Sequence, residues 1–170
     1  MRSGDSLTTE EFSALLRSVE RVSGALAVRD RTILEILGGT GLSISELVAL
    51  RVRQVVRDGR AVAALKLTAA QSDQTRGRKI PLSDRLRGHI EGYVIWLRGY
   101  YKGNHLFPGY EGTPLTTRAV QKRMRRLATA AGLAAGKVSP HCLKEFFINH
   151  LVDSSMDCES PAAIEPSEVI

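Results

Sequence analysis

The residues best placed to do chemistry lie in one short segment, Ser139-Pro-His-Cys-Leu-Lys-Glu-Phe-Phe147. Ser139 followed by Pro140 is typical of a helix start, because serine caps the first amides and proline fits the first turn. His141 and Lys144 are three residues apart, so on such a helix they share a face and can contact one phosphate group. The free amides of the helix N-terminus would add to this binding. The alternative is a capped helix with a polar outer face.

A second segment could neutralise a polyanion. Four cations recur there at helical spacing, namely Arg118, Lys122, Arg125 and Arg126. Val120, Met124 and Leu127 occupy the opposite side, and residues 117–132 contain no acid. This pattern predicts a helix that packs on the core and presents a cationic stripe to nucleic-acid phosphates. A solvated basic surface helix is the alternative, although such helices usually mix both charge signs.

The charge of the whole chain supports a polyanionic partner. Residues 1–152 hold all 24 Lys and Arg against 13 acids, a net charge of +11, whereas the last 18 residues carry −5. The composition is that of a globular protein, and the two cysteines form neither a disulfide framework nor a metal motif. We therefore expect a reduced, cytoplasmic protein without metal, cofactor or membrane association, and nucleoid-associated if the partner is DNA.

Two segments about ninety residues apart carry a family resemblance. Gly39-Thr-Gly-Leu-Ser-Ile-Ser-Glu-Leu-Val-Ala-Leu-Arg51 resembles the tyrosine recombinase, or phage integrase, pattern T-G-L-R-I-S-E-L. The segment from Ser139 to Phe147 resembles the same family's P-H-x-L-R-H-x-F. The resemblance covers roughly residues 7–152 and implies a catalytic-domain-like fold that binds double-stranded DNA.

In that family two arginines stabilise the phosphate during strand cleavage by tyrosine. The resemblance places Ser43 and Lys144 at the two arginine positions. A serine hydroxyl carries no charge, and a lysine lacks the bidentate fork of arginine. Ser43-x-x-Glu46 is also a capping box, so we expect Ser43 to cap a helix and Glu46 to cap it reciprocally.

The family also places a lysine, the general acid, in a turn between two strands. By alignment this position falls near Gln71, and glutamine cannot deliver a proton. Arg76, Arg78 and Lys79 follow in the same loop, and we expect them to contact the DNA backbone; a solvated hairpin tip is the alternative. Lys66, on the preceding strand, is a conceivable substitute for the missing acid.

The nucleophile is the remaining family element. All four tyrosines, Tyr93, Tyr100, Tyr101 and Tyr110, precede His141, and none stands where the family places its nucleophile. With the degenerate positions Ser43, Gln71, His141 and Lys144, we expect no catalytic residue and no strand cleavage. The hypothesis is a regulatory or accessory factor of a mobile element or plasmid. An active recombinase with atypical residues, or a modulator that binds an intact recombinase or itself, are the alternatives.

The elements that must position these residues follow from local patterns. We expect helices after Thr8, over 28–37 and 43–50, and after Ser83, Thr116 and Ser139. Strands are expected over 53–56, 61–67 and 78–82, with a hairpin at Asp58-Gly59. The fold class is therefore α+β and mainly helical, with a small three-stranded antiparallel sheet. The predicted organisation is an extension over 1–6, the integrase-like domain over 7–152, and an acidic, disordered tail over 153–170.

Overall fold

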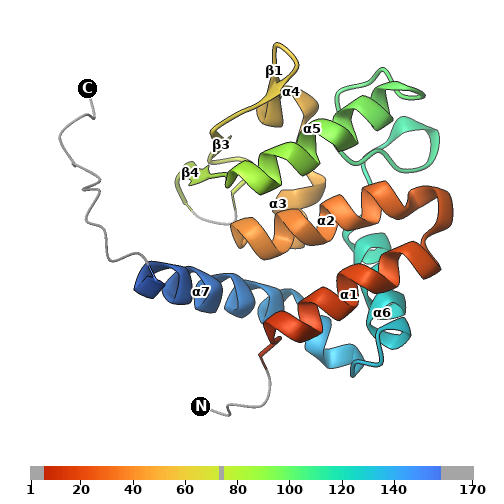
Figure 1. Ribbon diagram of the computed structural model, residues 1–170. Coiled ribbons are helices and arrows are strands. Elements are labelled where there is room, and N and C mark those ends of the chain that lie inside the picture. The colour runs from red at the N-terminus through yellow and green to blue at the C-terminus, as the bar shows by residue number, and fades with distance from the viewer. Residues whose placement is uncertain (1–5, 73–74, 158–170) are drawn as a thin grey trace.

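Helices make up most of the protein in its computed structural model, which describes residues 6–72 and 75–157 (Figure 1). The helices are α1 (Thr9–Val22), α2 (Ala27–Thr40), α3 (Ile44–Val48), α4 (Val52–Val55), α5 (Asp84–Arg98), α6 (Thr117–Ala130) and α7 (Pro140–Asp157). Short 3₁₀ turns lie at η1 (Gly24–Leu26), η2 (Tyr110–Gly112) and η3 (Ala135–Val138). The mainly helical α+β class expected from the sequence is confirmed.

The strands form two separate hairpins. Strand β1 (Val56–Arg57) pairs with β2 (Arg60–Ala61), and β3 (Ala64–Leu67) pairs with β4 (Arg78–Pro81), both antiparallel. The described residues thus contain two two-stranded sheets, and the expected single three-stranded sheet is wrong.

Most of the first expected strand, 53–56, forms a helical turn instead. Residues 53–55 belong to α4, in which Val52 and Val55 are both buried at a spacing that suits a helix. The Gln54 side chain accepts the amide hydrogen of Arg51 at 2.9 Å and so caps this turn. Local capping and burial therefore override the β propensity of the valines.

Helix α2 forms the centre of the fold. It packs against α1, α5 and α7, and Figure 1 shows it between α5 and α7. Its side chains are buried on several sides, including Ile33, Leu34, Ile36 and Leu37. A helix that is apolar on most of its circumference belongs in the interior. The loop that follows α2, residues 41–43, therefore starts close to the elements that pack against this helix.

Helix α7 begins as the sequence predicts and ends later. Ser139 Oγ accepts the amide hydrogen of Cys142 at 3.2 Å, which caps the helix start. The helix runs through Asp157, so residues 153–157 are helical where the acidic tail was expected to be disordered. The remainder of that tail, from residue 158, lies outside the described residues, as do residues 1–5.

Candidate functional site

Ser43 lies in the loop between α2 and α3 and caps α3. Ser43 Oγ accepts the amide hydrogen of Glu46 at 3.1 Å, and Glu46 Oε2 accepts the amide hydrogen of Ser43 at 2.9 Å. This is the reciprocal capping box that the sequence predicts. The Ser43 hydroxyl is therefore held by the helix start.

Glu46 also binds Arg78, a cation that was predicted from the sequence to contact DNA. The Glu46 side chain is only 1% exposed, and Arg78 Nη2 of β4 lies 2.5 Å from its Oε2. Ser72 Oγ donates to the other carboxylate oxygen at 3.4 Å. A buried carboxylate requires such a partner. Arg78, which was expected to contact DNA together with the other loop residues, joins the loop to α3 through this ion pair.

Gln71 is held by a reciprocal pair of amides. Gln54 Nε2 donates to Gln71 Oε1 at 2.8 Å, and Gln71 Nε2 donates to Gln54 Oε1 at 3.0 Å. Gln71 Oε1 also accepts the amide hydrogen of Thr68 at 3.3 Å. The side chain at the family lysine position thus ties the β3–β4 loop to α4. It carries neither charge nor a transferable proton.

Helix α7 meets the Ser43 loop at a glycine. A Cβ added to Gly41 would lie 2.5 Å from Phe147 Cδ1, so the loop and the helix are in direct contact. Lys144 is one turn before Phe147 on the same helix and is half-buried. His141 is exposed, and its Nε2 lies 3.1 Å from Glu145 Oε1. That carboxylate competes with any phosphate for the imidazole.

The structure connects two of the degenerate positions around the start of α3. Ser43 caps that helix, and Gln71 is next to Ser72, whose Oγ donates to Glu46 of the same capping box. Lys144 lies one turn before Phe147, the residue that contacts Gly41 in the preceding loop. Ser43 and Gln71 are neutral and held by hydrogen bonds, so neither offers a charge or an arginine fork to a phosphate.

A basic groove opens beside this site. We call it the strand groove; it has a volume of about 960 Å³ and is lined by residues of α4 and the strands, together with Gln71. Five lining side chains are cationic and none is acidic: Arg51, Arg53, Arg57, Lys66 and Lys79. Such a groove concentrates positive potential.

Three cations of this groove, Arg51, Arg53 and Arg57, were not predicted from the sequence to bind DNA. A signal is present in the sequence, because residues 47–57 contain three arginines and no acid. Part of this segment, 53–56, was predicted to form a strand. Of the loop residues that were proposed, Arg76 and Lys79 are exposed.

A second groove lies along α6. It has a volume of about 690 Å³ and is called the α6 groove here. The four cations of the predicted stripe all line it, namely Arg118, Lys122, Arg125 and Arg126. Val120, Met124 and Leu127 are buried on the opposite side, as the helical spacing predicts. Arg123 differs from its neighbours, because its Nε lies 3.2 Å from Asp30 Oδ2 of α2.

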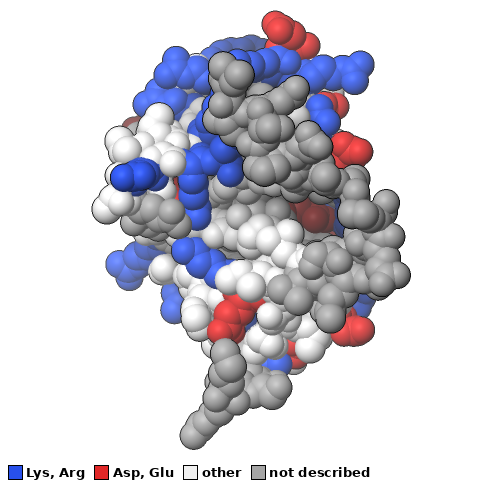
Figure 2. Space-filling view, turned by 90° about the vertical axis from the view of Figure 1, so that its left-hand side faces the viewer, with Lys and Arg blue, Asp and Glu red and all other residues white. Residues whose placement is uncertain are grey.

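The face seen in Figure 2 shows how unevenly the charges are distributed. Lysine and arginine side chains crowd its upper part, on the side of the molecule where Figure 1 places the strands and α4. White surface lies below them, with acidic side chains at the top, along the right-hand side and in the lower middle. The visible cations of this face thus gather mainly on its upper part.

The comparisons with known proteins agree with this geometry. The model of the phage integrase family matches residues 5–162. The chain belongs to this family. "Tyrosine recombinase XerD" of Pseudomonas aeruginosa is 34% identical over 157 residues, covering 89% of this chain and 50% of the relative. "Tyrosine recombinase XerC" of Xanthomonas axonopodis pv. citri is 35% identical over 134 residues, covering 78% of this chain and 41% of the relative.

Solved structures of phage integrase family members share the fold. XerA recombinase superposes with a TM-score of 0.71 at 19% identity, covering 88% of this chain and 51% of XerA. XerH site-specific recombinase, bound to its palindromic difH substrate, gives a TM-score of 0.71 at 22% identity, covering 90% of this chain and 43% of XerH. The chain spans about half the length of the curated relatives it matches.

Residues 6–72 and 75–157 contain no cluster of three or more histidine, cysteine, aspartate or glutamate side chains arranged to hold a metal ion. Over the same ranges, no helix combines the length and the apolar character needed to cross a membrane.

Proposed function

We propose that this phage integrase family chain binds double-stranded DNA without cleaving it, as an accessory or regulatory factor of a mobile element or plasmid. The strand groove carries the proposal, because five cations and no acid line a groove that adjoins the family's cleavage positions. Neutralising backbone phosphates with such side chains releases counterions, which drives binding independently of base sequence.

The α6 groove supports the same partner from a second element. Its four cations lie at i, i+4, i+7 and i+8 of one helix, so they project on one side. A helix of this kind can lie along a DNA groove with its cations on the phosphates. The XerH structure of the same fold is a complex with its difH substrate, which is consistent with DNA as the partner of this chain.

The inactivity we propose is based on the residues of the site. Ser43 cannot replace a guanidinium, and its hydroxyl is already bound to the α3 backbone. Gln71 cannot protonate a leaving oxygen, and its amide is bound to Gln54. Removing one preorganised donor of this kind costs on the order of 3 kcal/mol of transition-state stabilisation. Two such losses leave little cleavage to observe.

One pair of experiments tests both parts of the proposal. Fluorescence anisotropy with a labelled duplex across a salt series should show binding whose affinity falls steeply as salt rises. A suicide substrate that traps phosphotyrosine adducts should give no covalent product, with an intact recombinase as the positive control. Absence of binding at the lowest salt contradicts DNA recognition. A trapped adduct that disappears in Tyr110→Phe or Tyr100→Phe would support an active recombinase with atypical residues.

A second candidate function rests on α7. Ile148 and Leu151 are 56% and 52% exposed, and they are three residues apart on one side of the helix. Exposed apolar pairs on a protruding helix favour a protein partner, such as an intact recombinase or a second copy. Co-purification that survives neutralisation of the α6 cations, but is lost in Ile148→Glu with Leu151→Glu, would establish a protein-binding modulator.

A further inference from the structure

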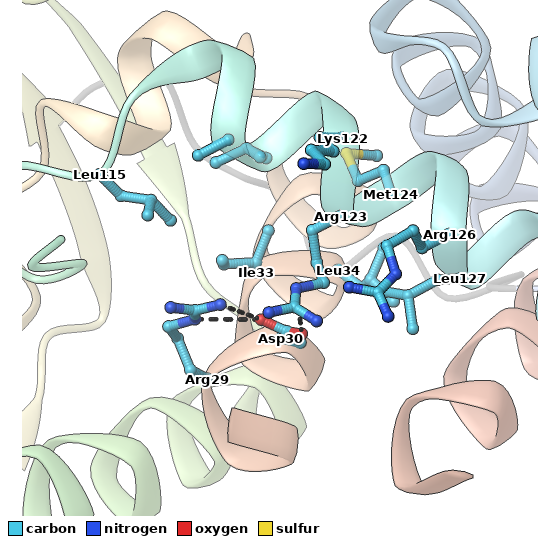
Figure 3. Close-up of a pocket in the computed structure, with 12 residues that line it drawn as sticks. Arg29, Asp30, Ile33, Leu34, Leu115, Lys122, Arg123, Met124, Arg126 and Leu127 are labelled. Atoms are coloured by element: carbon cyan, nitrogen blue, oxygen red, sulfur yellow. Dashed lines mark hydrogen bonds and ion pairs between the residues drawn. The ribbon is translucent and has the colours of Figure 1, made fainter. Parts of the chain in front are cut away.

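A pocket between α2 and α6 has the features of a small-ligand site. Its volume is about 270 Å³, slightly below the range that holds drug-sized molecules. Ile33, Leu34 and Met124 provide apolar lining, while the polar side is formed by residues of both helices (Figure 3). A pocket with one apolar and one charged side selects for an amphipathic ligand.

A buried acid organises the charged side. Asp30 is 1% exposed, and its Oδ1 accepts hydrogen bonds from Arg29 Nε at 3.0 Å and Nη2 at 2.9 Å. Its Oδ2 accepts from Ser23 Oγ at 2.7 Å and lies 3.2 Å from Arg123 Nε. Figure 3 shows the two guanidiniums reaching Asp30 from different helices. The carboxylate thus fixes both arginines in position.

The two guanidiniums keep donors to spare. Within the described residues, Arg29 Nη1 and both terminal nitrogens of Arg123 make no hydrogen bond or ion pair to a protein group. Among the described residues, Arg78 Nε is the only side-chain nitrogen or oxygen that is both buried and without a partner. The unpaired nitrogens of Arg29 and Arg123 are therefore not buried and remain accessible. Guanidinium donors held in a fixed orientation bind carboxylate and phosphate groups well.

The lining of the pocket carries an excess of positive charge. Arg29, Lys122, Arg123 and Arg126 face a single acid, Asp30. In Figure 3 the Arg126 side chain points into the same space as Arg123. Charges of one sign beside apolar walls attract counter-ions more strongly than the same charges in open water. The excess cation therefore favours an anionic ligand.

We propose that this pocket binds a small organic anion, a phosphate monoester or carboxylate that carries an apolar group. Arg123 and Arg29 hold the anionic group, and the apolar group lies against Ile33 and Met124. A phosphate of duplex DNA has the same anionic chemistry, but it is esterified on both sides and brings no apolar group to this lining. The pocket shares Lys122 and Arg126 with the α6 groove, but Arg29 and Arg123, which hold the anionic group, are not among the cations proposed to bind DNA.

The chain provides a specific probe for this pocket. Met124 lines the pocket, and the chain has two other methionines, Met1 and Met156, so a carbon-13 methyl label reports on the pocket once Met124→Leu has assigned the Met124 signal. Phenyl phosphate should shift the Met124 methyl resonance saturably, with a dissociation constant at least tenfold lower than that of inorganic phosphate. The difference measures the apolar lining.

Two variants separate the charged and apolar contributions. Arg123→Gln should raise the dissociation constant of phenyl phosphate at least tenfold, whereas Arg17→Gln, on the exposed side of α1, should not change it. Ala119→Leu fills the pocket without removing charge and should abolish phenyl phosphate binding, which keeps the test valid if Arg123→Gln does not fold. An unmoved Met124 resonance, or equal binding by wild type and both pocket variants, overturns the proposal. The proposal is also overturned if a short DNA duplex shifts the Met124 resonance and phenyl phosphate does not. Fluorescence anisotropy with the same duplex tests the proposed DNA binding separately.

Discussion

Phe147 packs against Gly41 so closely that an added Cβ would lie 2.5 Å from its Cδ1. Gly41 also has a φ of +67°, in the left-handed region that glycine tolerates best, and its amide bonds to Leu37 O at 3.3 Å to close α2. One glycine thus ends a helix and admits a ring from the other motif segment. This contact places α7 and the Ser43 loop together.

Replacing Gly41 by alanine should destabilise the protein by about 3 kcal/mol, because left-handed strain adds to a clash with the Phe147 ring. Gly59→Ala is the matched control, since Gly59 has a φ of +76° with no atom near its added Cβ. It should cost about 1 kcal/mol. Urea unfolding measures both. Equal losses would show that the Phe147 contact contributes nothing.

Replacing Arg78 by alanine should lower the free energy of unfolding by about 3 kcal/mol, because it leaves the buried Glu46 carboxylate without its cation. Arg76→Ala, an exposed residue of the same loop, should change stability by less than about 0.5 kcal/mol. The double variant Glu46→Gln with Arg78→Met should recover part of the loss. An Arg78→Ala protein as stable as wild type would show that the ion pair with Glu46 contributes nothing to folding.

Neutralising cations of the α6 stripe should weaken DNA binding and make the remaining affinity less dependent on salt. Each phosphate contact that is lost should reduce the slope of log affinity against log salt by about 0.9. Arg118→Gln and Arg125→Gln test the α6 groove, and Arg53→Gln with Arg57→Gln test the strand groove. Arg17→Gln should leave the slope unchanged. An identical slope in the groove variants would mean that these cations do not face phosphates.

Replacing Ser43 by alanine should cost about 1 kcal/mol of stability, since the α3 N-cap is lost. Ser43→Gly should cost only a few tenths of a kcal/mol. DNA affinity at fixed salt should be the same in both variants and in wild type. A drop in affinity with unchanged stability would place the hydroxyl on the DNA.

Acid should weaken the cap of α1 through Glu11. Its backbone bond with Thr8 and then its pairing with Lys137, 2.9 Å away, hold the pKa of Glu11 below the usual 4.5. The ionised form is therefore favoured by folding, and its contribution is complete above 4.5 and lost as the pH falls through the lower folded value. The stability difference between wild type and Glu11→Gln should disappear in that range. A difference that persists below that range would contradict this role for the Glu11 carboxylate.

The features that the sequence predicts well are local ones. The capping boxes at Thr8 and Ser43 and the one-sided α6 stripe depend on residues close together in the sequence, and the structure contains all three. The end of α2 was predicted wrongly: the helix expected over 28–37 continues through Gly38 and Gly39 to Thr40. The strands were harder to predict, because Val52 and Val55 suit a strand or a helical turn equally. Their assignment was decided by burial against the rest of the fold and by the Gln54 cap.

The sequence by itself determined the family and the helical framework, because these are properties of residue type and spacing. Only the tertiary structure decided the partners. It showed that Arg78 binds Glu46, that Gln71 binds Gln54, and that Arg123 binds Asp30. The partners in these pairs are 17 to 93 residues apart. Ionic and amide pairs between distant segments form where packing excludes water, and no local pattern encodes which segments will meet.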